Sequence, residues 1–180
     1  MEDLPRTPRP NRSEYYMGIA MAVRKRANCL GSRVGSVLVR EDRIISTGYN
    51  GTPQHMRNCD EGGCERCANR DKFPPGLGYD VCICVHAEQN ALLSAARFGI
   101  PVESAVLYTT LRPCFNCAKE LVQARVHAVQ YLHDWKHPDH ELQHQYRLLE
   151  QKFSGGVAHI AMPDPDVAWA VSGLRVNAGV

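Results

Sequence analysis

The sequence lacks long hydrophobic runs, a marked charge excess and a high aromatic content. Its longest stretch without Asp, Glu, Lys or Arg covers residues 44–56 and contains glycine, proline and histidine, so we expect no membrane span and no membrane partner. With 21 basic against 19 acidic residues and 7% aromatics, the chain lacks the usual composition of a nucleic-acid binder. No apolar segment follows the N-terminal charges, which predicts no secretory signal and a cytoplasmic location.

The composition is otherwise that of a folded domain. The chain has 180 residues, of which 44% are hydrophobic and 22% charged, enough for one domain with a buried core. It also contains eight cysteines. Because the cytosol is reducing, we expect these thiols to be metal ligands rather than disulfides.

Basic residues gather in three local clusters, at residues 6–12, 24–26 and 66–72. The simplest interpretation of each cluster is a solvated charged face. The alternative is a site for small phosphorylated ligands.

The chain is expected to contain one domain with flanking segments. Residues 1–10, rich in proline and arginine, predict a flexible arm. Residues 11–162 predict a single domain, in which residues 50–85 form a cysteine-rich insertion with little regular structure. Residues 163–180 have apolar residues at mixed spacing, which leaves open a docked helix or a loose end.

Hydrophobic periodicity predicts an α/β fold. A hairpin followed by alternating helices and strands favours a mixed sheet of about five strands with helices on both faces, in three α/β/α layers. The expected helices cover residues 12–28, 86–98, 114–124 and 140–152. The expected strands cover residues 34–40, 43–49, 104–110, 126–132 and 156–161.

Two short motifs predict a catalytic zinc site. His86 lies two residues before Glu88, and Cys114 follows a proline and precedes Cys117 by three residues. One imidazole and two thiolates leave a fourth tetrahedral position for water, as in catalytic zinc sites. Glu88 is then free to act as general acid and base. The alternative is a purely structural zinc held by the same His86, Cys114 and Cys117.

These motifs resemble those of the cytidine deaminase-like superfamily and, within it, the deoxycytidylate (dCMP) deaminases. The resemblance covers residues 12–162 and rests on RVG at 33–35, IISTGYNGTP at 44–53, HAEQNA at 86–91 and YTTLRPCFNCAK at 108–119. It implies the three-layer cytidine deaminase-like fold. It also implies hydrolysis of dCMP to dUMP and ammonia, which supplies dTTP synthesis.

Substrate contacts are implied by the same resemblance. Asn50 is expected to hold the sugar, Thr109 and Thr110 to line the base pocket, and Trp135 to close over the substrate. Asn50 has an alternative role in a left-handed turn before Gly51. Trp135 is also compatible with a place in the core. The resemblance names no residue for the phosphate.

A second, structural zinc is implied by the resemblance to phage dCMP deaminases and to competence-associated members. Its expected ligands are Cys29, Cys59, Cys64 and Cys82. Cys67 and Cys84 could substitute for the last two, and unliganded thiols are the remaining alternative. A zinc there would fix an insertion that has few apolar residues of its own.

Assembly and regulation are likewise implied by resemblance alone. It predicts a homohexamer activated by dCTP and inhibited by dTTP, each with Mg²⁺. The candidate elements are Gly48, Tyr49 and Gly51 in the turn after the hairpin, and Arg97, which is otherwise a cation at a helix C-terminus. Other functions compatible with the motifs are deamination of another cytosine nucleotide or of nucleic acid, and a non-catalytic zinc module.

Overall fold

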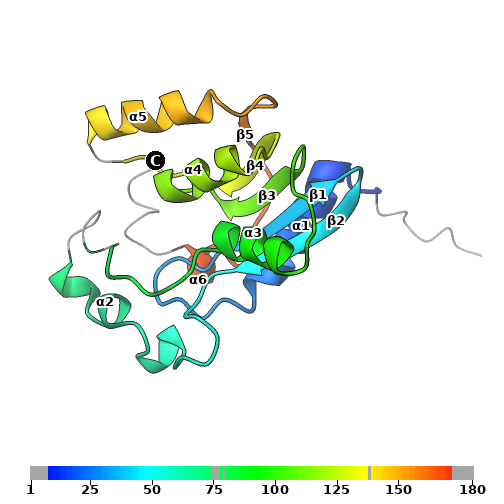
Figure 1. Ribbon diagram of the computed structural model, residues 1–180. Coiled ribbons are helices and arrows are strands. Elements are labelled where there is room, and N and C mark those ends of the chain that lie inside the picture. Colours follow the sequence, from blue (N-terminus) through cyan, green and yellow to red (C-terminus); the bar gives the residue numbers. More distant parts are fainter. Residues whose placement is uncertain (1–7, 74–77, 79, 138, 172–180) are drawn as a thin grey trace, which may run out of the picture.

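The computed structural model describes residues 8–73, 78, 80–137 and 139–171 (Figure 1). Most of the predicted N-terminal arm and residues 172–180 of the predicted tail lie outside the described residues. The principal helices are α1 (Arg12–Arg24), α3 (Ala87–Arg97), α4 (Phe115–Gln123) and α5 (His140–Glu150). The strands are β1 (Gly35–Arg40), β2 (Arg43–Tyr49), β3 (Val106–Leu111), β4 (Ala128–His133) and β5 (Val157–His159).

The five strands form one mixed sheet in the order β2-β1-β3-β4-β5. β1 pairs antiparallel with both β2 and β3, whereas β4 runs parallel to β3 and to β5. The hairpin therefore forms one edge, and the parallel strands follow from the crossover helices α4 and α5. This confirms the predicted α/β class and the mixed sheet.

Helices cover both faces of the sheet, because successive strand residues point to opposite sides. On one face, Met17 of α1 packs against Val37 and Tyr108. On the other face, Leu38 and Leu107 pack with residues of α3 and α4. Figure 1 shows the same layers, with α1 behind the sheet and α3 in front. The three-layer α/β/α prediction is thus confirmed.

Several predicted boundaries were wrong by two residues or more: the end of α1, the starts of β3 and β4, and the ends of α5 and β5. Local contacts explain the first two. α1 ends at Arg24 rather than at residue 28, because the backbone N–H of Asn28 leaves the helix to bond to the carbonyl of Asn50. β3 starts at Val106 rather than at residue 104, because Ser104 has a φ of 64°, which a strand does not accommodate.

The helical elements in the described part of the insertion are short: η1 (Cys59–Glu61), α2 (Glu65–Ala68) and η2 (Arg70–Lys72). They lie together below the sheet, apart from α5 (Figure 1). Among the described residues, no helix combines the length and apolarity needed to cross a membrane.

Residues 163–171 are docked on the domain, which answers the question left open for this part of the tail. Asp164 pairs with the fully buried guanidinium of Arg24 through two contacts of 2.7 Å. Further along, α6 (Val167–Ala170) is held by the N–H of Arg33, which donates to the carbonyl of Ala170 at 2.7 Å. This segment therefore packs against the C-terminal end of α1 through Asp164.

Candidate active site

Three potential metal ligands meet at the N-terminal ends of two helices. His86 immediately precedes α3, Cys114 immediately precedes α4, and Cys117 lies in the first turn of α4. His86 Nδ1 is 3.4 Å from Cys114 Sγ and 3.3 Å from Cys117 Sγ, and the two sulfurs are 3.5 Å apart. The backbone N–H of His86 donates to Oε1 of Gln89, which fixes the chain at this corner.

This donor set fits zinc. With Zn–S near 2.3 Å and Zn–N near 2.1 Å, tetrahedral geometry separates ligand atoms by about 3.5–3.8 Å, close to the spacing found here. A hydrogen bond shared with Cys117 lowers the pKa of the Cys114 thiol to about 4, against the opposing effect of burial. His86 lowers this pKa further. The same hydrogen bond raises the pKa of Cys117, so Cys114 is the thiol of this pair that ionises more readily.

A buried carboxylate lies beside these ligands. Glu88 is only 4% exposed, and burial raises the pKa of its carboxyl. Its Oε1 accepts a hydrogen bond from Thr109 Oγ1 at 3.2 Å, and Thr109 Oγ1 accepts one from Ser36 Oγ at 2.9 Å. Two strands of the sheet therefore fix the orientation of a carboxylate carried by α3.

Asn50 and Thr110, both predicted to contact substrate, tie the segment before β1 to the site. Asn50 Oδ1 accepts from the N–H of Val34 at 2.7 Å, and its amide donates to the carbonyl of Ser32 at 2.8 Å. Thr110 Oγ1 accepts from the N–H of Gly35 at 3.1 Å. Asn50 also lines the cavity that contains Glu88, and its φ is not in the left-handed region.

Trp135 is not among the described residues that line the cavity. Its indole N–H donates to the carbonyl of Arg112 at 2.8 Å, and its ring packs edge-on against Tyr146 at 5.3 Å. It also packs against Ala87 and Leu111. These contacts match the core interpretation of this residue.

The turn residues Gly48, Tyr49 and Gly51 hold α3 in place. A Cβ on Gly48 would lie 2.1 Å from the carbonyl oxygen of Ala87, so glycine permits close packing of β2 on α3. The carbonyl of Tyr49 accepts from Asn90 at 2.7 Å, and Gly51 forms an isolated antiparallel bridge with Val85. Arg97, in contrast, is exposed at the last turn of α3, with its guanidinium 5.7 Å from the Phe98 ring centroid.

The cavity at Glu88 is also lined by Arg66 and Arg70, from the basic cluster at residues 66–72. The sequence left this cluster open as a site for small phosphorylated ligands, but only the fold brings α2 and η2 to the cavity. Arg112 is another lining residue, and it is bound by carboxylates. Its guanidinium pairs with Glu150 and with Asp134, which ties α5 to the end of β3.

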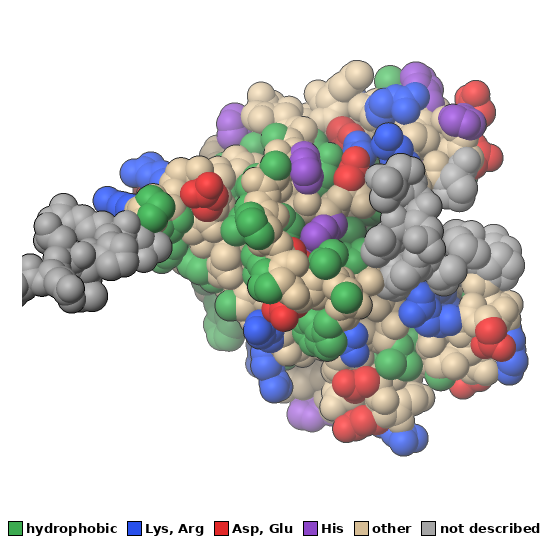
Figure 2. Space-filling model, turned by 180° about the vertical axis from the view of Figure 1, so that it is seen from behind, with side chains coloured by type: hydrophobic (Ala, Val, Ile, Leu, Met, Phe, Trp, Pro, Cys, Tyr) green, Lys and Arg blue, Asp and Glu red, His purple; other side chains and the backbone are tan. Residues whose placement is uncertain are grey.

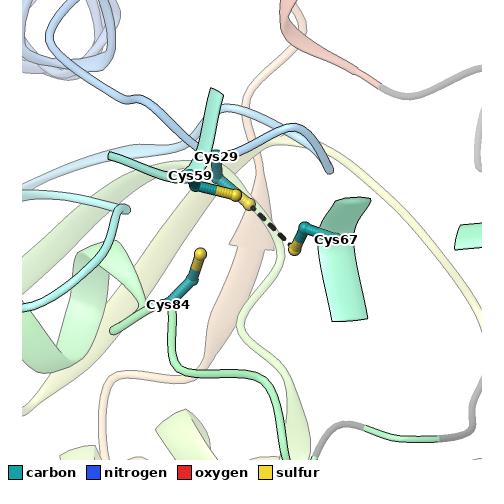
Figure 3. Close-up of side chains that lie close together, drawn as sticks. All are labelled: Cys29, Cys59, Cys67 and Cys84. Carbon is teal, nitrogen blue, oxygen red and sulfur yellow. Dashed lines mark hydrogen bonds between the residues drawn. The ribbon is translucent and has the colours of Figure 1, made fainter. Parts of the chain in front are cut away.

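The six other cysteines form one cluster between the end of α1 and the start of α3. Two overlapping groups have all their sulfurs within 4.8 Å of one another: Cys29, Cys59, Cys67 and Cys84, and Cys64, Cys67, Cys82 and Cys84. Figure 3 shows the first group, with the sulfurs converging. The four thiols predicted as one ligand set are divided between the two groups.

Cys67 and Cys84, predicted only as substitutes, belong to both groups. A sequence signal for Cys67 was available: Cys64 and Cys67 have the same spacing as Cys114 and Cys117. Cys64 precedes α2 just as Cys114 precedes α4, so both pairs place two sulfurs on one helical turn.

Taken together, the three-layer fold and the site define a zinc-dependent deaminase-type domain. The family described as "Cytidine and deoxycytidylate deaminase zinc-binding region" matches residues 10–133. The chain belongs to this family.

Several known proteins resemble this chain. The deoxycytidylate deaminase of Schizosaccharomyces pombe is 45% identical over 123 residues, which cover 68% of this chain and 37% of that protein. The deoxycytidylate deaminase of Mycobacterium phage D29 is 37% identical over 129 residues, 68% of this chain and 95% of that protein. The chain thus spans well under half of the yeast relative but matches nearly all of the phage protein.

A solved structure also matches the fold. The dCMP deaminase of cyanophage S-TIM5, in complex with dCMP and dUMP, superposes with a TM-score of 0.64 at 27% sequence identity. The match covers 86% of this chain and 100% of that chain.

Proposed function

We propose that the chain catalyses the hydrolytic deamination of dCMP to dUMP and ammonia. The observation that carries the proposal is the buried Glu88 beside the His86, Cys114 and Cys117 donor set. The dCMP and dUMP in the S-TIM5 relative and the names of the yeast and phage relatives support it. Residues 11–162 are the proposed catalytic domain.

Glu88 is the proposed general acid and base. It accepts a proton from the attacking water and delivers it to N3 of the pyrimidine. It then takes the proton of the new C4 hydroxyl and gives it to the departing amine, as the C4–N bond breaks and the C4 carbonyl forms. Its raised pKa suits a group that must hold the proton between these steps. Zinc held by His86, Cys114 and Cys117 supplies the Lewis acidity that makes water a nucleophile at neutral pH.

Thr109 is proposed to hold the Glu88 carboxylate toward the substrate. Asn50 and Thr110 are proposed to shape the base and sugar pocket, Asn50 directly and Thr110 through β1. Trp135 is proposed to support this pocket through its packing against Ala87 and Leu111. Each of these roles uses the hydrogen bonds described above.

Arg66 and Arg70 are the proposed phosphate-binding residues. Both line the cavity that also holds Glu88, so a nucleotide base at Glu88 can direct its 5′-phosphate toward them. Arginine is well suited to a phosphate dianion because its guanidinium offers paired donors. Arg112 is a weaker candidate, because Glu150 and Asp134 already neutralise its charge.

Several broader properties belong to the same proposal. The cysteine cluster is proposed to hold structural zinc. The protein is proposed to be a cytoplasmic homohexamer that supplies dTTP synthesis, activated by dCTP and inhibited by dTTP, with Mg²⁺ on each triphosphate. Gly48, Tyr49, Gly51 and the exposed Arg97 remain the proposed elements of this response.

A substrate panel tests the proposed function. Purified protein is incubated with dCMP, CMP, deoxycytidine and a cytosine oligonucleotide, and conversion to uracil is followed by absorbance. We expect turnover with dCMP and little with the others. Preferred turnover of the oligonucleotide would favour nucleic-acid editing. The structure argues against this alternative, because acidic and basic side chains are interspersed on the face shown in Figure 2 and form no basic groove there. No turnover of any substrate would overturn the proposal.

A further inference from the structure

The cysteine cluster is the core of the insertion. Five of its six cysteines are buried, and Cys82 is partly buried. The other partly buried hydrophobic residues packed against it are Leu30 and Ile83. Among the described residues of the insertion, so little aliphatic surface supplies too little hydrophobic free energy to order a segment of this length. The thiols themselves must therefore provide the stabilising contacts.

The sulfur positions fit metal coordination rather than disulfides. Cys29 Sγ lies 4.0 Å from Cys67 Sγ, and Cys82 Sγ lies 3.8 Å from both Cys64 and Cys67 Sγ. A disulfide requires about 2.05 Å. Four thiolates about 2.3 Å from one zinc lie about 3.8 Å apart at the corners of a tetrahedron. The three distances above match this spacing, and all sulfurs of each group lie within 4.8 Å of one another.

We propose that the six cysteines hold two zinc ions, with Cys67 and Cys84 bridging between them. Each four-sulfur group is a complete tetrahedral ligand set, and the two groups share these two members. Cys29 and Cys59 complete one site, and Cys64 and Cys82 complete the other. Two four-ligand sites that share two ligands use all six thiols, as in known Zn₂Cys₆ modules.

The surroundings of the cluster suit thiolates. The backbone N–H of Leu30 donates to Cys59 Sγ at 3.4 Å, and that of Gly31 donates to Cys29 Sγ at 3.3 Å. Arg70 donates to the carbonyl of Leu30 at 2.8 Å, which holds this turn in place. Two Zn²⁺ ions with six thiolates carry a formal charge of −2, the same as one zinc with four thiolates. A second ion therefore uses two more thiols without adding charge.

The cluster also orders one wall of the cavity. Cys64 immediately precedes α2, and Cys67 lies within it beside Arg66. Arg70 follows in η2. Cys67 and Cys84 line the same cavity as Glu88. Two metal ions joined by shared sulfurs therefore fix this wall both at Cys67 in α2 and at Cys84.

Zinc counting on the full chain tests the number of ions. The protein is washed with a weak chelator, and bound zinc is measured by native mass spectrometry and by elemental analysis. We expect three zinc ions per chain in the wild type and two in Cys114→Ala, which loses the site at His86. A wild type with two ions and a variant with one would mean a mononuclear cluster and overturn the proposal.

Cadmium substitution tests the bridge without any variant. The chain is reconstituted with ¹¹³Cd, and one-dimensional and correlation NMR spectra are recorded. Two resonances typical of four-sulfur coordination, joined by a resolved ¹¹³Cd–¹¹³Cd coupling through shared sulfur, are expected. A single four-sulfur resonance, or two without coupling, would contradict bridging thiolates.

Cys82 gives a chemical readout because it is the partly exposed member of the cluster. In the zinc-loaded protein, we expect iodoacetamide to leave Cys82 unmodified until a strong chelator is added. In zinc counting, Cys67→Ser is expected to lose both cluster ions, whereas Cys82→Ser retains at least the ion bound by Cys29 and Cys59. Rapid alkylation of Cys82 in the loaded protein, or equal zinc loss in the two variants, would refute the shared-ligand arrangement.

Discussion

Thr109 on β3 donates a hydrogen bond to Glu88 on α3, with 3.2 Å between the two oxygens. The donor comes from a central strand and the acceptor from the first turn of a helix packed on that sheet. Ser36 on β1 donates in turn to Thr109. The proposed proton carrier is therefore oriented by two adjacent strands of the sheet, and not by a loop.

Replacing Thr109 by Val should slow catalysis more than it weakens substrate binding. Val keeps the shape of the fully buried side chain but removes the donor. A hydrogen bond to a charged group contributes about 1.5–3 kcal/mol, so we expect kcat to fall about 10- to 100-fold. Zinc content and KM should change little. Thr109→Ser, which keeps the hydroxyl, should recover most of the activity; equal loss in both variants would assign Thr109 a packing role instead.

Glu88→Gln should abolish deamination while leaving the zinc content and fold unchanged. The amide preserves size and most hydrogen bonds but cannot carry the proton, and such groups contribute about 10²- to 10⁴-fold. Turnover of dCMP and zinc per chain are measured together. Glu103→Gln, at an exposed ion pair with Arg125, is the matched control and should retain full activity. Activity above about a hundredth of wild type in Glu88→Gln would contradict the assignment.

Arg66→Gln should weaken recognition of the 5′-phosphate of dCMP and leave recognition of the base and sugar unchanged. We expect the KM for dCMP to rise about tenfold or more, because a charge-assisted contact contributes about 1.5–3 kcal/mol. The slow turnover of deoxycytidine should stay unchanged. Lys72→Gln is the control, because Lys72 is an exposed cation of the same segment that bonds to Asn69. A parallel loss with dCMP and deoxycytidine would show that Arg66 supports the fold and not the phosphate.

Gly48→Ala should destabilise the protein and disturb the site. The added Cβ would meet the backbone of α3 at Ala87 and Ala91, so helix and strand must separate. Overpacking costs about 1–3 kcal/mol, which urea denaturation can measure. Gly18→Ala is the control, because a Cβ there meets nothing within 4 Å and should stabilise α1 by about 0.5–1 kcal/mol. Equal stability of the two variants would show that β2 and α3 tolerate a wider separation.

Asp164 should contribute to stability at neutral pH but not in strong acid. Burial alone raises a carboxyl pKa, yet hydrogen bonds from Arg24 and His133 outweigh it and hold the pKa of Asp164 well below its ordinary value. The contribution is therefore complete above about pH 4 and is lost as pH falls through the lowered pKa. Asp166 also faces Arg24, at 3.9 Å, and supplies part of the same field.

Urea denaturation of wild type and Asp164→Asn between pH 7 and pH 2 checks this expectation. At pH 7 the variant should be less stable by about 3–5 kcal/mol, because the buried Arg24 loses its two short contacts and keeps only the longer one to Asp166. Below about pH 4 the difference should narrow. A difference that stays constant down to pH 2 would mean that Asp164 acts through shape and not through charge.

The catalytic site could be predicted because its residues come from regular elements. His86, Cys114 and Cys117 lie at helix starts, where spacing along the chain determines position in space. The layers of the sheet followed from the alternation of helices and strands after the hairpin. In the structure, Val37 and Leu38 pack on opposite faces of the sheet. Boundaries such as Ser104 were missed, because a positive φ in a non-glycine residue has no signature in periodicity.

The cysteine cluster could be predicted only as a set of ligands. Residues 50–85 have no hydrophobic period, so nothing in the sequence relates Cys59 to Cys84 in space. The spacing between Cys64 and Cys67 was the one local signal. Likewise, the proximity of Arg66 to Glu88 depends on how the insertion returns to the sheet, which is a property of the fold.

The pair formed by Arg24 and Asp164 has a consequence for the order of folding. The two residues are 140 positions apart, so their contact can form only after nearly all of the domain has been synthesised. Until then, α1 carries a guanidinium that cannot be buried without cost, which opposes the docking of its last turn. A nascent chain or a truncation that ends before Asp164 is therefore exposed to aggregation and proteolysis. Asp164 thus completes the environment of a helix that is synthesised well before it.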